Sequence, residues 1–297
     1  MFDALTVVQK LKEDIAAIAT RLDQLALQLG AGNTAPSERD LAGRPFYGFS
    51  PKDGFHVLKD KWYQKSFIGQ QSKELREGLD AAISATRKAV PRRTSEQSFR
   101  LISPSGRISG EKIRGKERKL ENTIWKRWKP RPDLQPCDAW KFIAACQVPL
   151  FDASEKRGWG HIDLLGVDEH GLLVIELKDG SSKEPPTRPL MEAASYAIAL
   201  QENWPGFMAE FEALLDEHDV TLTSDLKREQ IRLMLLAPHE YWERWRKAQT
   251  VTRAAWDEYS LLIKALKENG LETRFADLNL DGDADGHEVR VIDCPPR

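Results

Sequence analysis

The sequence predicts a mixed α/β protein, and three observations support this fold class. Two apolar segments, residues 161–167 and 172–178, flank the short turn Asp168-Glu169-His170-Gly171, as in a β-hairpin. From residue 108 onward, segments with helical spacing of apolar residues alternate with further apolar runs. Near the N-terminus, a heptad pattern predicts one long helix. We therefore expect a mixed sheet flanked by helices, preceded by a coiled-coil helix.

Composition excludes two broad classes of protein. The chain has 297 residues, 41% of them hydrophobic, and 44 Lys and Arg stand against 46 Asp and Glu. That hydrophobic fraction is too high for a disordered chain and too low for a membrane bundle, and no run of about 18 apolar residues occurs. The N-terminal residues lack a secretory-signal pattern, and the three cysteines form no CxxC or Cys/His cluster. We expect free thiols and a cytoplasmic protein without a membrane segment.

Residues 5–29 are predicted to form one helix with a heptad seam. Apolar residues recur there at alternating spacings of four and three, which is typical of a coiled coil. The residues of the seam are Leu11, Ile15, Ile18, Leu22, Leu25 and Leu29. Gly30 and Gly32 end the helix. We expect residues 1–30 to assemble a homo-oligomer; the alternative is a helix that packs on its own domain.

Residues 31–95 are expected to form a linker followed by a small helical and aromatic region. Residues 30–54 are rich in Gly, Pro and polar residues, and residues 70–90 have helical spacing that ends before Pro91. We expect a domain boundary near residue 95.

The remaining domain, residues 96–297, alternates helices and strands. Helices are predicted within 108–128, centred on the sequence KERKLENTIWKRW, and at 139–145, 190–201, 207–218, 240–248 and 254–269. Strands are predicted at 147–151, 161–167, 172–178, 231–236, 273–280 and 288–292. This order describes a mixed sheet with flanking helices.

A basic block lies near the start of this domain. Residues 86–131 contain 15 Lys and Arg against four Glu. Such a block can attract a polyanion such as nucleic acid; the alternative is a solvated helical face beside a loop.

The hairpin at residues 161–178 carries the most informative charges. If Val167 pairs with Leu172, Asp163 lies directly across from Glu176, with Cβ atoms about 5 Å apart. Two carboxylates so placed repel each other unless a divalent cation or a shared proton neutralises them. Oxygen ligands of this kind suit Mg²⁺ or Mn²⁺. Lys178 shares the face of Glu176 and adds a positive charge; the alternative is an ordinary Glu–Lys pair on an exposed hairpin.

The helix before the hairpin supplies further carboxylates. Glu117 and Glu121 are four residues apart and therefore lie on one helical face, near the apolar residues Leu120, Ile124 and Trp125. We select Glu121 as the third carboxylate of the site, with Glu117 as the alternate.

The order of an acidic helix, then Asp163, then Glu176-Leu177-Lys178 at the end of an apolar strand resembles the PD-(D/E)XK nuclease superfamily. The resemblance spans residues 110–240. It implies a restriction-endonuclease-like fold and metal-dependent hydrolysis of phosphodiester bonds. It also implies that Asp163, Glu176 and the backbone carbonyl of Leu177 bind Mg²⁺ or Mn²⁺, that Lys178 acts on the attacking water, and that Glu121 lies beside the site.

The chain departs from this family pattern at two places. The helix after the strand often carries a Gln and a Tyr four residues apart that face nucleic acid; here Tyr196 is present, but Glu192 stands in place of the Gln. The proline of the motif is also absent, because His161 and Ile162 precede Asp163.

The resemblance thus implies an Mg²⁺-dependent endodeoxyribonuclease, with DNA favoured over RNA because most of the relatives that it suggests act on DNA. Arg114, Lys116, Lys119 and Tyr196 are the predicted nucleic-acid contacts. One alternative is a catalytically silent nucleic-acid-binding or assembly module of the same fold. Another is an effector in anti-phage defence that an unidentified protein partner or ligand activates.

Overall fold

The computed structural model describes most of the chain after residue 50. The described residues are 51–58, 68–93, 99, 101, 115–150, 159–222, 225–248, 251–279 and 288–292. The predicted coiled-coil helix at 5–29 and Arg114 lie outside them. Contacts divide the chain between Arg44 and Pro45, whereas the sequence predicts a boundary near residue 95.

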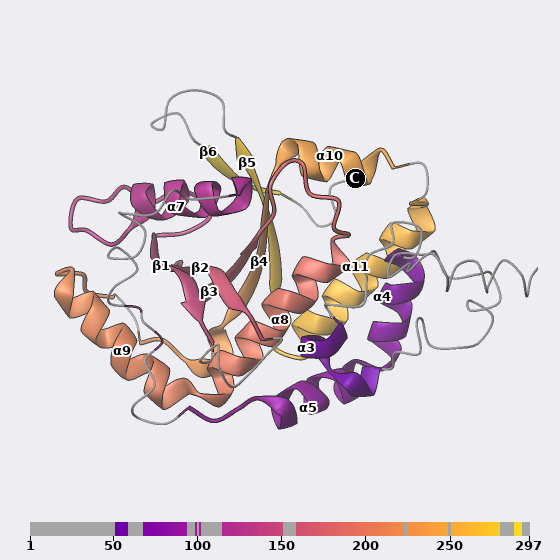
Figure 1. Ribbon diagram of the computed structural model, residues 1–297, viewed down its shortest axis with the longest axis horizontal. Coiled ribbons are helices and arrows are strands. Elements are labelled where there is room, and N and C mark those ends of the chain that lie inside the picture. Colours follow the sequence, from indigo (N-terminus) through magenta and orange to yellow (C-terminus); the bar gives the residue numbers. More distant parts are fainter. Residues whose placement is uncertain are drawn as a thin grey trace, which may run out of the picture. The chain divides into compact units, whose positions relative to one another are not determined.

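A six-stranded mixed sheet forms the centre of the fold, and its strands are ordered as in the sequence (Figure 1). They are β1 (Phe142–Pro149), β2 (His161–Val167), β3 (Leu172–Leu177), β4 (Arg232–Pro238), β5 (Thr273–Asn279) and β6 (Glu288–Ile292). β1, β2 and β3 form an antiparallel meander, β4 and β5 continue the sheet in parallel, and β6 is antiparallel to β5. The predicted mixed α/β class is confirmed.

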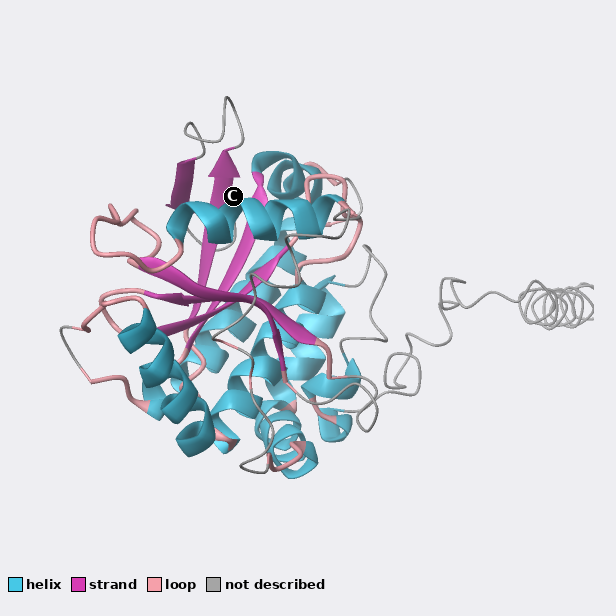
Figure 2. Ribbon diagram, turned by 60° about the vertical axis from the view of Figure 1, so that its left-hand side comes forward, coloured by secondary structure: helices cyan, strands magenta, loops and turns pink. Residues whose placement is uncertain are grey.

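Helices lie on both sides of the sheet (Figure 2). They are α3 (Phe55–Leu58), α4 (Ile68–Glu77), α5 (Leu79–Ala89), α7 (Lys116–Trp128), α8 (Thr187–Glu202), α9 (Trp204–Glu217), α10 (His239–Arg246) and α11 (Arg253–Glu268). α7 packs Ile124, Trp125 and Trp128 into a core with one face of the sheet. α8 packs against β3 and β4, and α3, α4 and α5 in turn contact α8. None of the described helices has the length and apolar character needed to cross a bilayer.

The hairpin of β2 and β3 has the predicted register. Val167 pairs with Leu172, and the ladder continues to Leu164 and Ile175. Its turn is closed by Asp168, whose Oδ1 accepts hydrogen bonds from the backbone N–H groups of His170 (2.8 Å) and Gly171 (3.1 Å). Gly171 has φ +151°, and a Cβ at this position would lie 2.7 Å from the carbonyl oxygen of Gln230, so only glycine fits the turn. The turn thereby sets which residues lie opposite each other near the site.

One predicted helix is wrong. Residues 139–145 were expected to be helical, but β1 begins at Phe142 and pairs with β2 along its length. Its first five residues, Phe142 to Cys146, are all buried, so the apolar run lacks the alternation that marks a half-exposed strand. The alanines at 144 and 145 favour a helix locally, and pairing with β2 overrides that preference.

The single helix predicted at 70–90 is two helices separated by Gly78. α4 packs along α11, and Gly69 allows this close approach, because a Cβ there would lie 2.8 Å from the Cα of Ala255. These helices therefore belong to the same packed unit as the sheet.

Candidate metal centre

The candidate site lies at one edge of the sheet, where β2 begins and β3 ends. Because these strands are antiparallel, Asp163 near the start of β2 is brought beside Glu176 near the end of β3. The regular ladder stops at Leu164 and Ile175, and the backbone N–H of Leu177 donates a hydrogen bond of 2.9 Å to Oδ2 of Asp163 instead. Lys178 follows directly, and its backbone N–H donates to the carbonyl of Leu236 on β4. Backbone pairing therefore fixes the positions of all three charged residues.

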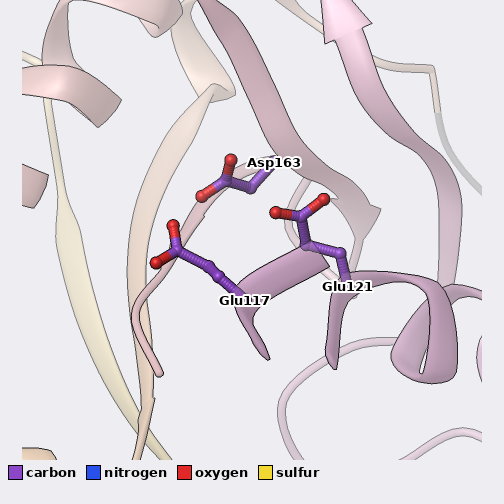
Figure 3. A group of neighbouring side chains, drawn as sticks. All are labelled: Glu117, Glu121 and Asp163. Carbon is purple, nitrogen blue, oxygen red and sulfur yellow. The ribbon is translucent and has the colours of Figure 1, made fainter. Parts of the chain in front are cut away.

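Two carboxylates from α7 meet Asp163. Carboxylate oxygens of Glu117, Glu121 and Asp163 lie within 4.8 Å of one another, and their side chains converge (Figure 3). Glu121 is only 3% exposed and Asp163 8%. The sequence offered Glu121 and Glu117 as alternatives; the structure brings both to Asp163, since one turn of helix separates them.

Lys178 lies at the centre of a second group of acids. Its Nζ is 2.8 Å from Oε1 of Glu176, and it also lies 3.3 Å from Glu184, 3.4 Å from Glu192 and 3.5 Å from Glu117. One further cation contributes, because Arg188 pairs with Glu184 at 3.1 Å and with Glu192 at 3.4 Å. The two groups together hold six carboxylates, whereas the cations that act on them are Lys178, Arg188 and, near Glu121, Arg118, which leaves an excess of negative charge if all the carboxylates are ionised.

Three oxygens of this group, Oε2 of Glu176, Glu184 and Glu192, are buried and accept no hydrogen bond from a described N–H or hydroxyl group. Those of Glu184 and Glu192 lie 3.3 and 3.4 Å from Nζ of Lys178, whereas Glu176 pairs with Lys178 through its other oxygen, Oε1, and its neighbours in hydrogen-bonding reach are the carboxyl groups of Asp163 and Glu192. A buried carboxylate oxygen without a donor is costly unless a cation or a proton satisfies it.

The pKa values reflect this crowding. Burial, together with the nearby charge of Asp163, raises the pKa of Glu121 from 4.5 to about 8 and that of Glu117 from 4.5 to about 7. Burial also raises the pKa of Asp163 from 3.8 to about 6, against the opposing effect of Lys178. The pKa of Glu176 is raised by burial and by Asp163. Burial disfavours the charge of Lys178, but the surrounding carboxylates outweigh it and raise its pKa well above 10.5.

These shifts predict a pH dependence of stability with a defined sign. Carboxyl groups whose pKa is higher in the folded protein bind protons more tightly when folded. Their stabilising contribution is complete below the unfolded values of 3.8 and 4.5 and is lost as the pH rises through about 6, 7 and 8. In EDTA, we therefore expect the melting temperature to fall between about pH 6 and pH 8.5, and saturating Mg²⁺ to reduce the fall because a bound cation favours the ionised form. A melting temperature in EDTA that stays constant over this range contradicts the prediction.

The predicted nucleic-acid contacts lie in different surroundings. Lys116 and Lys119 are exposed on the outer face of α7. Tyr196 is only 4% exposed, and the same carboxylates, after burial itself, raise the pKa of its hydroxyl. The side chain therefore belongs to the buried surroundings of Glu176 and Glu192 and not to an outer surface.

Three residues of the site were not selected from the sequence. Glu192 is one turn before Tyr196 on α8, and this spacing was an available signal. Glu184 lies in the segment between β3 and α8, where no periodicity marks it. Gln147 was signalled only by being a polar residue within an apolar strand, and its amide donates to Oδ1 of Asp163 at 3.3 Å.

Comparisons of the chain with protein-family models, with curated proteins and with solved structures gave no match. The geometry of the site is therefore the basis for assigning a function.

Proposed function

We propose that the protein is a metal-dependent nuclease that hydrolyses phosphodiester bonds, with DNA as the favoured substrate. The observation that carries the proposal is the burial of Asp163, Glu176 and Lys178 in one site, where Oε2 of Glu176 lies outside the ion pair that Oε1 makes with Lys178. The element order agrees with a restriction-endonuclease-like core, since α7 is followed by the antiparallel strands β1 to β3, by α8, and by β4 parallel to β3.

The donor set fits a divalent cation. Glu117, Glu121 and Asp163 offer carboxylate oxygens within 4.8 Å of one another, and Glu176 offers Oε2, which its ion pair with Lys178 leaves unused. Hard oxygen ligands in this number suit Mg²⁺ or Mn²⁺. When bound, such a cation supplies Lewis-acid stabilisation of the charge that develops on the phosphate, and it lowers the pKa of water.

Lys178 would contribute a fixed positive charge. Its raised pKa keeps the ammonium protonated at neutral pH, and its contact with Glu176 at 2.8 Å holds the group at the end of β3. A charged donor so placed can stabilise a phosphate oxygen as water attacks phosphorus and the bond to the leaving oxygen breaks. Because Lys178 would share the site with the cation, its charge would add to the stabilisation that the cation supplies.

The outer face of α7 supports a nucleic-acid substrate. Lys116, Arg118, Lys119, Lys126 and Lys129 are exposed on this helix and its end, and none of them forms an ion pair with another described residue. We call these five residues the α7 cation face. The same helix carries Glu117 and Glu121 on its inner side, so a phosphate backbone attracted to the cation face would lie one helix width from the site.

The α7 cation face yields a prediction about binding. The double variant Lys119→Ala/Lys126→Ala is expected to bind DNA more weakly and to reduce the slope of log affinity against log salt by about 2, because two phosphate contacts are lost. Fluorescence anisotropy with labelled duplex at several salt concentrations measures this slope. Lys264→Ala, which removes another exposed lysine, one on α11 that lies 4.0 Å from Glu268, is the control and should leave it unchanged. An unchanged slope in the double variant excludes these lysines from binding.

Cleavage of plasmid DNA tests the proposed function. Purified protein is incubated with plasmid in Mg²⁺, in Mn²⁺ and in EDTA, alongside Glu176→Ala and Lys178→Ala. We expect nicking that depends on the metal and is lost in both variants. DNA binding that survives both substitutions, without cleavage under any condition, would instead identify a silent binding module.

A further inference from the structure

Gln147 has an unusual backbone conformation at a position next to the site. In the pairing of β1 with β2, Cys146 lies opposite Leu164 and Val148 opposite Ile162, so Gln147 lies opposite Asp163. Its φ is +51°, and Asp219 is the only other non-glycine residue with positive φ in the described chain. Residues other than glycine seldom adopt this conformation, and they keep it only where the surrounding structure requires it.

The side chain of Gln147 contacts two carboxylates that come from different elements. Its Nε2 donates to Oδ1 of Asp163 on β2 at 3.3 Å, and the side chain also forms a hydrogen bond with Glu121 on α7, which lowers the pKa of that group. An amide nitrogen carries two protons, so a single Gln can donate to both. The other oxygen of Asp163 accepts the backbone N–H of Leu177, which leaves this carboxylate held from both sides.

We propose that Gln147 is a positioning residue that holds the carboxylates of Glu121 and Asp163 in the arrangement that receives a divalent cation. The inference rests on the proposed function, because it assumes that this cluster binds a metal. Without the amide, Glu121 and Asp163 would lose the donor that they share, and once both are ionised the 4.8 Å grouping would have to be rebuilt when the cation binds. Glycine would fit the backbone at φ +51° with less strain than Gln does. The side-chain amide, which glycine lacks, is therefore the reason that we infer for Gln at this position.

Two variants separate the donor from the backbone. Gln147→Met keeps the length and the strained backbone but removes the donor, whereas Gln147→Gly removes the donor and relieves the strain. Mn²⁺ affinity is measured by electron paramagnetic resonance of the free ion, and the melting temperature is measured in EDTA. We expect both variants to bind Mn²⁺ about tenfold more weakly than wild type. We also expect Gln147→Gly to melt at a higher temperature than Gln147→Met.

The outcomes distinguish the inference from the function on which it rests. If wild type binds Mn²⁺ and Gln147→Met binds it equally well, Gln147 is not a positioning residue, although the metal site stands. If wild type binds no Mn²⁺, the proposed function and the inference both fail. If Gln147→Gly binds Mn²⁺ as tightly as wild type, the amide donor is not required and the inference is overturned.

Discussion

The Glu176→Gln variant is expected to lose metal-dependent cleavage by about 10²–10³-fold and yet to be more stable than wild type in EDTA. Gln keeps an oxygen that can accept from Lys178, which lies 2.8 Å from Oε1 of Glu176. It removes the negative charge that burial and Asp163 oppose, as the raised pKa of Glu176 indicates. Each kcal/mol gained would raise the melting temperature by about 2–4 °C in a chain of this size.

A second buried carboxylate on the same hairpin provides the control. The side chain of Asp168 is fully buried, but it is satisfied by Arg232, by Arg274 at 3.1 Å, and by two backbone N–H groups. Asp168→Asn removes a charge that two guanidinium groups require, so it should be destabilising. Thermal unfolding in EDTA compares the two variants. If Glu176→Gln is destabilising like Asp168→Asn, the negative charge of Glu176 is already stabilised by groups of the protein, and the site does not need a cation.

Replacing Lys178 by Met is expected to cause the largest loss of stability at this site. The ammonium group is buried and contacts Glu176, Glu184, Glu192 and Glu117, so its removal leaves four carboxylates with Arg188 as their remaining cation among the described residues. Removing one partner of a buried ion pair lowers the free energy of unfolding by about 3–5 kcal/mol. The loss should be smaller at low pH, where the carboxyl groups are protonated.

The Lys178→Arg variant and added metal test the cause of this loss. Arg keeps the charge, so it should retain much of the stability, but its planar fork cannot occupy the position of the ammonium and cleavage should still be lost. Mg²⁺ should restore part of the stability of Lys178→Met, because it supplies positive charge to the same carboxylates. Urea unfolding with and without Mg²⁺ measures both effects. Equal stability of Lys178→Met and wild type at neutral pH would show that the carboxylates are already protonated.

The sequence predicted correctly those elements that depend on residues close together in the chain. The helix KERKLENTIWKRW occupies the expected residues, because its apolar positions repeat at helical spacing. The register of the hairpin followed from the short turn between two apolar strands. The helix expected at 139–145 failed because alanine favours a helix locally, whereas pairing with β2 decides the structure.

The candidate site could be predicted only in part. Asp163, Glu176 and Lys178 were readable because the hairpin fixes their spacing, and Glu117 and Glu121 because helical spacing places them on one face. Glu184 and Gln147 reach the cluster through tertiary packing of β1 and of the segment before α8, which no spacing in the sequence expresses, and the signal for Glu192 was its place one turn before Tyr196.

Diffraction from a crystal soaked in MnCl₂, recorded where manganese scatters anomalously, locates the cation directly. We expect an anomalous peak at the edge of the sheet, with a carboxylate oxygen of Asp163 among its ligands and with further oxygens from the group of Glu117, Glu121 and Glu176. A peak that lies only elsewhere, or its absence from Asp163 at saturating Mn²⁺, would contradict the metal centre and the hydrolysis proposed for it.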